Sequence, residues 1–240
     1  MQDQFLIRED IPAYMADLKK WLAEIREQPL EEMTEFFAAR LEGYEEHMAF
    51  WADAYRQMGK LIPEHAKTLL DLGCGTGLEL EEIFRRTPGL AVTGIDLSAE
   101  MLGRLGEKFP QVRTVCADYF EADFGERQFD TAVSFETLHH FKPEKKKGLF
   151  EKILRALKPG GIYIQADYLA CCEEEERILT EFCRKKREEQ GIPEDVFIHF
   201  DTPLTAEHEM SLLRQAGFSR VEWDGCIKGA AFLKAWKECD

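Results

Sequence analysis

The chain has 240 residues, of which 45% are hydrophobic and 32% are charged, and its formal net charge at pH 7 is −15. This length and balance predict a globular protein with one sizeable α/β domain and an appendage, or with two small domains. The negative charge disfavours tight binding to a nucleic-acid backbone, and no uninterrupted apolar run is long enough to span a bilayer.

The seven cysteines are scattered, and none belongs to a CxxC pair. This pattern predicts neither a disulfide framework nor a zinc site, and we predict no metal site of any kind. The N-terminal residues do not form a basic and apolar leader. Free thiols suit a reducing compartment, so we expect the protein to act in the cytoplasm.

Residues 1–62 are predicted to form a helical cap, because three apolar stripes recur at helical spacing. The first stripe comprises Met15, Leu18, Leu22 and Ile25, and the second comprises Met33, Phe36 and Phe37. The third comprises Tyr44, Met48, Trp51, Tyr55 and Met58. Pro12 can open the first helix, and Pro29 separates it from the second.

Residues 63–240 are predicted to form an α/β core, because short apolar strands alternate with amphipathic helices. We expect strands at residues 68–72, 91–96, 112–117, 129–135 and 161–168. The helices expected between them span residues 78–86, 99–108 and 143–157. Strands joined through helices run parallel, and helices then cover both faces of the sheet.

The C-terminal part of the chain departs from this alternation. Two strands are expected at residues 219–224 and 230–236, joined by the five residues 225–229, which predicts a hairpin with an antiparallel last strand. The fold class is thus a seven-stranded, mostly parallel sheet. Residues 169–204 are expected to be an inserted lid, whose acidic run at 173–176 makes a solvated helix start.

The stretch LLDLGCGTG, residues 69–77, carries three glycines at every second position. Gly73, Gly75 and Gly77 end a predicted strand and open a helix, where glycine lets the backbone turn and lets a ligand approach. The Gly-Lys-Ser/Thr of a Walker loop is absent, and the spacing differs from the GxGxxG of dinucleotide sites. Asp71 suits a ligand whose first contact is an ammonium or a carboxylate.

Two further acids, Asp96 and Asp118, end or follow the next two predicted strands. Asp96 can accept hydrogen bonds from the vicinal hydroxyls of a ribose, and Asp118 can accept one from an adenine amino group. Because the carboxyl ends of parallel strands meet at one edge of the sheet, Asp71, Asp96 and Asp118 together predict a nucleoside site there.

From about residue 67 to its C-terminus, the chain resembles the class I S-adenosylmethionine-dependent methyltransferases, in their small-molecule branch. LLDLGCGTG is similar to the first motif of this family, VTGIDLSAEML to the second and CADYF to the adenine-side acid. FDTAVSFETLHHF and LRALKPGGIYIQADY resemble the motifs of the fourth and fifth strands. The resemblance implies a Rossmann-like fold, S-adenosylmethionine as cofactor and methyl transfer to a small molecule.

The resemblance also implies a set of cofactor-binding residues. These are Asp71, Gly73, Cys74, Gly75, Gly77, Asp96, Leu97, Met101, Asp118, Tyr119 and Glu136. Glu136 and Thr137 would face the sulfonium and the acceptor. FFAARLEGYEEHM resembles an element in which a tyrosine closes over the cofactor, which points to Tyr44.

Methyl transfer from a sulfonium is an in-line displacement, so the protein mainly aligns the reactants and excludes water. A general base helps where the acceptor carries a proton. The candidates are His139, His140, Tyr168, His199 and Asp201. The adjacent side chains of His139 and His140 are expected to diverge, so that one of them is structural. His199 belongs either to a lid packed on the sheet or to a gate over the acceptor pocket.

Other functions stay open. The fold and the paired histidines also resemble the carboxy-S-adenosylmethionine synthases of tRNA wobble-uridine modification, which need a positive residue for the additional carboxylate. A non-catalytic module that binds S-adenosylmethionine is a further alternative. The GxGxG spacing and the hairpin disfavour a nicotinamide-dependent oxidoreductase. The cap covers its own active site or that of a second copy, which leaves a homodimer open.

Overall fold

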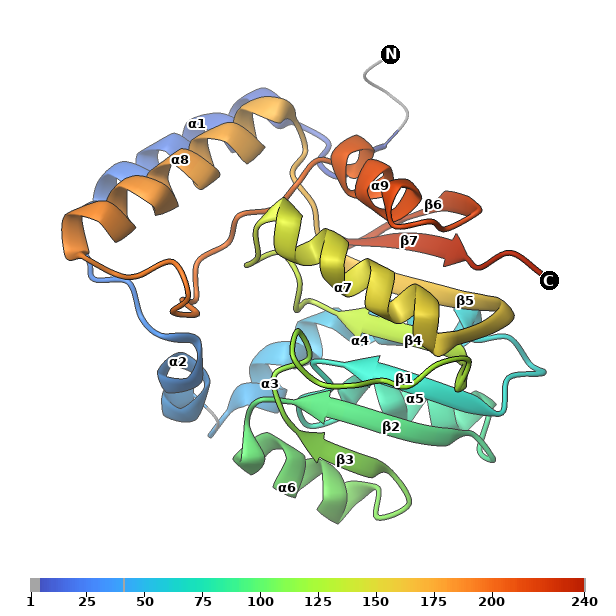
Figure 1. The fold of residues 1–240 in the computed structure, drawn as a ribbon. Helices are drawn as coiled ribbons and strands as arrows, with labels where there is room; N and C mark the ends of the chain where they lie inside the picture. The colour runs from blue at the N-terminus through green and yellow to red at the C-terminus, as the bar shows by residue number, and fades with distance from the viewer. Residues whose placement is uncertain (1–4, 41, 240) are drawn as a thin grey trace.

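The computed structural model describes residues 5–40 and 42–239, without the side chains of residues 37 and 38. Within these ranges it forms one seven-stranded sheet in the order β3-β2-β1-β4-β5-β7-β6 (Figure 1). The strands are β1 (Thr68–Leu72), β2 (Ala91–Asp96), β3 (Arg113–Cys116), β4 (Phe129–Phe135), β5 (Leu157–Tyr168), β6 (Arg220–Ile227) and β7 (Ala230–Trp236). Strand β7 is antiparallel to both of its neighbours, and the other strand pairs are parallel. The predicted fold class is confirmed.

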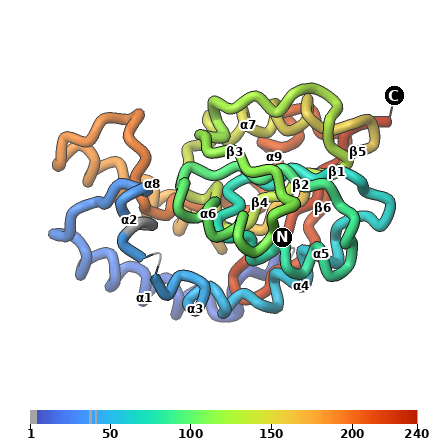
Figure 2. Tube along the Cα trace, turned by 90° about the horizontal axis from the view of Figure 1, so that it is seen from below, coloured from blue at the N-terminus to red at the C-terminus, as the bar shows by residue number. Residues whose placement is uncertain are grey.

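Helices cover both faces of the sheet, and β1 supplies side chains to the core on each face. Leu70 and Leu72 join the cluster beneath α7 (Pro143–Ala156) and α9 (Ala206–Gln215). Leu69 joins the cluster beneath α4 (Ala52–Leu61), α5 (Leu78–Arg86) and α6 (Ala99–Lys108). Figure 2 shows α7 on one side of the sheet and α4 and α5 on the other. Successive side chains of a strand point to opposite faces, so an apolar run such as TLLDL suits a strand buried on both sides.

The strand order reverses between β1 and β4, because β2 and β3 lie on one side of β1 and β4 and β5 on the other. Ligands of open α/β sheets bind at such a switch point, outside the carboxyl ends of the strands. The arrowheads of β1, β2 and β3 in Figure 1 point toward the side on which α1, α2 and α8 stand. The N-terminal helices therefore flank the edge where a ligand is expected.

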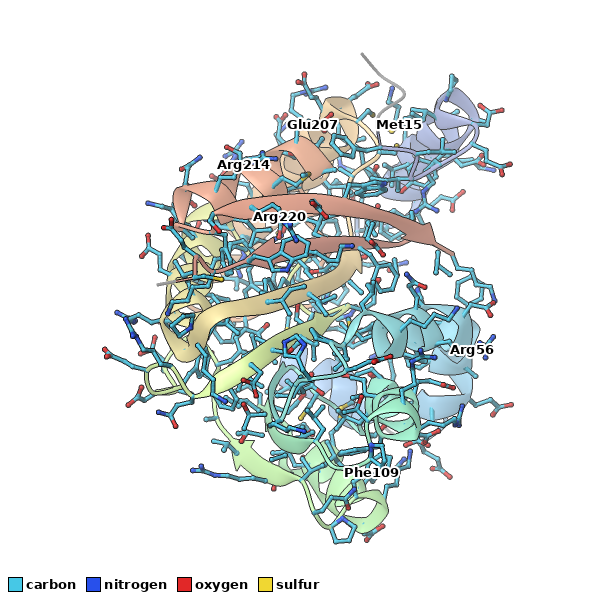
Figure 3. All side chains as sticks on the ribbon, turned by 90° about the vertical axis from the view of Figure 1, so that its right-hand side faces the viewer. Met15, Arg56, Phe109, Glu207, Arg214 and Arg220 are labelled. Atoms are coloured by element: carbon cyan, nitrogen blue, oxygen red, sulfur yellow. The ribbon has the colours of Figure 1, made fainter. Side chains whose placement is uncertain are left out.

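The first helix of the chain packs on the inserted segment and not on the sheet. Helix α1 (Ile11–Glu24) lies beside α8 (Glu173–Gln190) in Figure 1. Their shared cluster contains Met15, Leu18, Leu22, Leu179, Cys183, Ile198 and Phe200. Figure 3 shows Met15 at the opposite end of the molecule from Phe109, which follows α6. Sequence-distant elements thus form one layer at the carboxyl edge of the sheet.

The other N-terminal stripes lie in α2 (Met33–Arg40), in α3 (Tyr44–Met48) with a short 3-10 turn (Ala49–Trp51), and in α4. The side chain of Phe37, predicted in the second stripe, lies outside the described residues. Helix α4 contacts α5 and contributes Tyr55 and Met58 to the core of the sheet. The division into a cap (1–62), a core (63–240) and a lid (169–204) stays a prediction.

The connection between the last two strands differs from the predicted five-residue loop. Strand β6 continues to Ile227, and only Lys228 and Gly229 make the turn, with φ of 52° and 95°. Gly225, predicted to open the loop, lies in an irregularity of the β6–β7 register, with φ of 107°. A glycine in a bulge and a glycine in a two-residue turn give the same sequence signal, which explains the error.

Other local predictions also needed correction. Strand β3 is shorter than predicted, and β5 begins four positions early at Leu157, where it pairs with Phe129. Helix α9, capped by the Thr205 side chain, was not predicted. In the acidic run at 173–176, Glu175 is buried instead of solvated, because two tyrosine hydroxyls and a backbone amide donate to it. Among the described residues, no helix is long and apolar enough to cross a membrane.

Candidate functional site

A first cleft, here called the inner cleft, opens at the carboxyl ends of β1, β2 and β4. It lies at the switch point of the sheet, where ligands of open α/β folds bind. Its lining residues are Met33, Thr34, Tyr44, Gly73, Gly75, Asp96, Leu97, Ser98, Met101, Asp118, Tyr119, Phe135, Glu136, Thr137, Phe141 and Phe197. Nine of the predicted cofactor residues are in this set. The switch point of the sheet therefore coincides with a cleft lined by the predicted motifs.

The glycine loop passes between the inner cleft and the turn after β4. Gly73 has a φ of 69°, and a Cβ atom there would lie 2.4 Å from Thr137 Oγ1. Gly75 has a φ of 48°, and a Cβ there would make ordinary contacts of 3.6 Å with Met101 Sδ and Tyr44 Oη. Gly73 thus allows a close approach of backbone to side chain. Gly75 leaves open the space in front of Tyr44 and Met101.

Asp96 ends β2 and orients the glycine loop. Its Oδ2 accepts a hydrogen bond from the Gly75 amide (2.9 Å), and its Oδ1 accepts one from the Ser98 amide (2.8 Å). Burial raises the pKa of this carboxyl above its ordinary value, although the backbone donors oppose the shift. Each carboxylate oxygen has a second lone pair, so Asp96 can still accept bonds from a ligand.

Asp118 and Tyr119 form the end of the inner cleft nearest β3. Asp118 Oδ1 accepts a hydrogen bond from the Phe120 amide (2.8 Å), which fixes the turn after the strand. The Tyr119 hydroxyl donates to the Thr137 carbonyl (3.2 Å) and ties this turn to the turn after β4. Phe141 and Phe197 add aromatic surface to the same cleft. An acid beside an aromatic wall suits a flat heterocycle with an amino group.

Three predicted cofactor residues, Asp71, Cys74 and Gly77, do not line the inner cleft in the described part of the chain. Asp71 lies inside β1 and not after it, and it is fully buried. Burial and the neighbouring Glu79 carboxyl raise the pKa of Asp71 well above its ordinary value. Cys74 packs toward Gly94 of β2, and Gly77 caps α5. Their predicted contacts with a ligand stay predictions.

A second cleft, here called the outer cleft, adjoins the inner one. Tyr44 and Glu136 line both. The other lining residues are Arg8, Phe36, Ala39, Arg40, Glu42, Gly43, His47, Met48, Phe50, Trp51, His139, His140, Tyr168, His199, Asp201, Lys228 and Gly229. The structure therefore gathers all five candidate general bases on one cleft, separated from the inner cleft by two shared side chains.

His139 is the most constrained of the candidate bases. Its Nδ1 lies 2.5 Å from Asp167 Oδ1, and its Nε2 lies 3.5 Å from Asp201 Oδ1. Burial opposes a charge on this ring, but the Asp167 and Asp201 carboxylates outweigh burial and raise the pKa of His139 to about 9. Asp167 also accepts hydrogen bonds from the amides of Leu138 and Tyr168, at 3.0 Å each.

His139 and His140 do not diverge as predicted. Their ring centroids are 4.0 Å apart, and His140 Nδ1 lies 3.2 Å from the same Asp201 oxygen that faces His139. Adjacent side chains diverge along a strand, but these residues lie in a turn closed by the Phe141 amide, which donates to the Leu138 carbonyl. Burial and the charge of His139 lower the pKa of His140.

His199 and Tyr168 are held by the helical cap. The His199 ring stacks on Phe36 with centroids 3.4 Å apart, and burial lowers the pKa of His199 to about 4. The Tyr168 hydroxyl lies 2.8 Å from that of Tyr14 and donates to Glu175. Burial and the Glu175 charge raise the pKa of Tyr168, so its phenol stays protonated at neutral pH.

Two residues were not predicted from the sequence: one lines the outer cleft, and the other holds a histidine of that cleft in place. Asp167 lies in β5 and contacts His139. The sequence feature that could have identified it is an acidic residue at the end of the buried run IYIQAD. Arg8 lines the outer cleft, with its guanidinium 4.3 Å from the centroid of the Tyr14 ring. No local pattern marks Arg8, because only the packing of the N-terminal segment brings it to the cleft.

Comparisons with known proteins agree with this geometry. Residues 69–161 match the family model described as a methyltransferase domain. The chain is 26% identical over 220 residues to a carboxy-S-adenosyl-L-methionine synthase of Campylobacter lari, across 83% of this chain and 92% of the relative.

Two solved structures show the same fold. An O-methyltransferase family protein from Burkholderia thailandensis has a TM-score of 0.70 at 18% identity, and the match spans 95% of this chain and 70% of the other chain. Human N-acetylserotonin methyltransferase in complex with SAM has a TM-score of 0.63 at 20% identity, and the match spans 90% of this chain and 65% of the human chain.

Proposed function

We propose that the chain transfers a methyl group to a small molecule held in the outer cleft. The premise is that the chain belongs to the class I S-adenosylmethionine-dependent methyltransferases. One observation carries the proposal. The inner cleft, with its glycine loop and strand-end acids, meets the outer cleft at Tyr44 and Glu136. Two adjoining clefts suit a nucleoside methyl donor and a separate acceptor.

The residues of the inner cleft fit S-adenosylmethionine, which supplies an activated methyl group on a sulfonium. Asp96 would accept the ribose hydroxyls, and Asp118 would accept the adenine amino group. The backbone at Gly75 would lie against the methionine part, since a side chain at this position would project toward Tyr44 and Met101. Leu97 and Met101 would give the nucleoside an apolar contact surface.

Tyr44 and Glu136 would separate the donor from the acceptor. Burial raises the pKa of Glu136 to about 8, so this carboxyl is largely neutral at pH 7. Burial and neighbouring acids also raise the pKa of Tyr44. Neutral groups at the junction keep anionic charge away from the reacting atoms while they exclude water and set the approach of the acceptor.

The histidines would have different roles. His139 is held as a charged ring between Asp167 and Asp201, so at neutral pH it positions its neighbours and does not accept a proton. The lowered pKa values leave His140 and His199 neutral, and a neutral ring can accept a proton from an acceptor. We assign the base to one of these two rings.

The acceptor would be small and the setting cytoplasmic. The stacked rings of Phe36 and His199 and the side chain of Tyr44 enclose the outer cleft from the cap side, and the net charge of −15 disfavours a polynucleotide. Light scattering would test whether the protein is a homodimer.

The test is methyl transfer to a panel of small hydroxyl, amine and thiol compounds. The readout is formation of S-adenosylhomocysteine, followed by mass spectrometry. We expect at least one acceptor to gain the mass of a methylene group with the natural chain and none with Asp96→Ala. A panel without acceptor-dependent turnover, in protein that binds the donor, would contradict catalysis and favour the non-catalytic binding module.

A second candidate is a carboxy-S-adenosylmethionine synthase, a name that several relatives of this chain carry. The observation in its favour is Arg8, a positive residue that lines the outer cleft against Tyr14 and Tyr168. Mass spectrometry of the nucleoside that copurifies with the protein separates the two. A species heavier than S-adenosylmethionine by a carboxylate, lost in Arg8→Ala, would favour this second function.

A further inference from the structure

We propose that His139, His140 and Asp201 form a binding site for a divalent transition-metal ion in the wall of the outer cleft. Two imidazoles and one carboxylate are a ligand set that suits zinc, iron(II), cobalt(II) and manganese(II), with the remaining positions open to substrate. One potential ligand atom from each residue lies within 4.8 Å of the others. The sequence predicted no metal site, because that prediction rested on the spacing of the cysteines, and this cluster contains none.

The distances fit a coordination sphere. Asp201 Oδ1 lies 3.2 Å from His140 Nδ1 and 3.5 Å from His139 Nε2. Ligand atoms of a tetrahedral zinc site, with bonds of about 2.0–2.1 Å, are separated by about 3.4 Å. A cation can therefore contact these three atoms after only small side-chain movements.

The support around His139 is the arrangement that metal-binding histidines use. Its Nδ1 is held at 2.5 Å by Asp167, a fully buried carboxylate that two backbone amides fix in place. This contact directs Nε2 toward Asp201 and the cleft, and an ion bound there displaces the proton that Nε2 otherwise carries at neutral pH. A carboxylate behind a ligating histidine orients the ring and makes the opposite nitrogen a better ligand.

Two buried polar atoms beside the cluster lack hydrogen bonds. Among the described residues, His140 Nδ1 has no hydrogen-bond partner, although its side chain is only 4% exposed and Asp201 Oδ1 is close. Glu136 Oε1 is also buried without a partner, and Glu136 Oε2 lies 3.9 Å from His139 Nδ1. A cation bonded to the His140 nitrogen and the Asp201 oxygen would give the first of these two atoms, His140 Nδ1, a partner.

The position of the site indicates the class of acceptor, an inference that rests on the proposed methyl transfer. Glu136 borders both clefts, so a cation beside it lies next to the junction of donor and acceptor. An acceptor hydroxyl that binds the cation loses its proton more readily, and since His140 then holds the ion, His199 of the same cleft is the base that accepts the proton. The acceptor oxygen then forms a C–O bond with the methyl carbon as the C–S bond breaks, and the sulfur keeps the electron pair. The acceptor is thus an alcohol or a phenol.

The test is cobalt(II) binding by the full chain after treatment with a chelator. Cobalt(II) bound by nitrogen and oxygen ligands absorbs visible light, so a titration measures the stoichiometry directly. We expect one ion per chain in the natural protein and no such bands in His140→Ala or Asp201→Asn. Asp167→Asn should weaken binding by about 10–100-fold, because it removes only the support of His139. His47→Ala is the matched control, since His47 lines the same cleft outside the cluster.

Circular dichroism of each variant shows whether it folds, and the conservative Asp201→Asn keeps the test valid if His140→Ala does not. No cobalt uptake by the natural chain, or bands that persist in both ligand variants, would overturn the proposal. Calorimetric titration of the same samples with S-adenosylmethionine is independent of metal binding. Cobalt binding without nucleoside binding would refute the proposed methyl transfer and leave the metal site standing. Nucleoside binding without cobalt binding would refute the metal site and leave the methyl transfer standing.

Discussion

The carboxylate of Asp96 is the single side chain on which the proposed binding of S-adenosylmethionine depends most. It borders the inner cleft and holds the amides of Gly75 and Ser98. If Asp96 binds the ribose as proposed, Asp96→Ala removes two charge-assisted hydrogen bonds, and we expect an affinity loss of about 100-fold, from about 3 kcal/mol. Calorimetry measures it. Asp123→Ala, an acid of a neighbouring loop that lines neither cleft, should bind normally. Equal affinities of the two variants would refute the ribose placement.

The glycine loop offers a matched pair of substitutions. Gly73→Ala places a methyl group 2.4 Å from Thr137 Oγ1, so Thr137 and its bond with Tyr119 must move. Gly75→Ala meets only ordinary contacts, with a left-handed φ as its main cost. We expect losses of about 2–4 and about 1 kcal/mol in the free energy of unfolding, respectively. Urea unfolding measures both. A Gly73→Ala variant as stable as Gly75→Ala would contradict the close contact.

Single residues differ in how far the sequence predicts them. The position of Asp96 and Asp118 beside the inner cleft was predictable, because the carboxyl ends of parallel strands meet at one edge of the sheet. The convergence of His139 and His140 on Asp201 was not predictable, because it depends on a turn after β4 and on the segment that follows α8. Arg8 reaches the outer cleft only through tertiary packing. Local patterns specify which side chains a strand presents, and contacts between distant segments need the folded chain.

At the scale of elements, Asp130 of β4 holds the starts of the neighbouring strands β1 and β5 together through its side chain. Its carboxylate accepts hydrogen bonds from the amides of Lys67 and Thr68 and pairs with Lys158 at 2.9 Å. Lys158 and these donors outweigh burial and lower the pKa of Asp130 to about 2. A carboxyl with a lowered pKa stabilises the fold above its unfolded pKa of about 4, and the contribution disappears as the pH falls toward 2.

Asp130→Asn should therefore cost about 1–2 kcal/mol of unfolding free energy at pH 7 and clearly less at pH 3. Urea unfolding of both proteins at the two pH values gives the difference. An equal cost at both pH values would show that the charge of Asp130 contributes nothing.

The pairing of α1 with α8 predicts a separately opening unit. Leu179 is 2% exposed in the cluster that joins these helices. Leu179→Ala should weaken their packing by about 2–4 kcal/mol and raise amide hydrogen exchange in α1 and α8, while β1 and β4 keep their protection. Thr180→Ala, at an exposed position of the same helix, is the control. Exchange that rises equally in β1 would mean that the cap and the core are one cooperative unit.

The elements themselves were largely predictable where periodicity is local. The bounds of β1, β2, β4 and β7, and of α5 and α6, agree with those predicted. Helix α9 was missed, although Thr205 caps it and Met210 and Leu213 give it an apolar face. The hairpin was misjudged because glycines serve both the bulge at Gly225 and the turn at Gly229. Propensity alone does not separate a glycine inside a strand from one that ends it.

At the scale of the whole molecule, the sheet places one cleft at its switch point and the cap builds a second cleft beside it. The N-terminal helices contribute Phe36 and Tyr44 to the outer cleft, and the segment after α8 contributes His199 and Asp201. A core that resembles many methyltransferases thus gains an outer cleft to which two regions outside the common motifs contribute, and we propose that this cleft holds the acceptor. Substrate choice should accordingly depend on the cap more than on the sheet.

The most direct measurement of the central claim is calorimetric titration of the purified protein with S-adenosylmethionine, S-adenosylhomocysteine and NADH. The inner cleft, with its GxGxG loop and the acids Asp96 and Asp118, predicts micromolar binding of both sulfur nucleosides and none of NADH. Binding of NADH, or failure of both sulfur nucleosides to bind a correctly folded protein, would contradict the account.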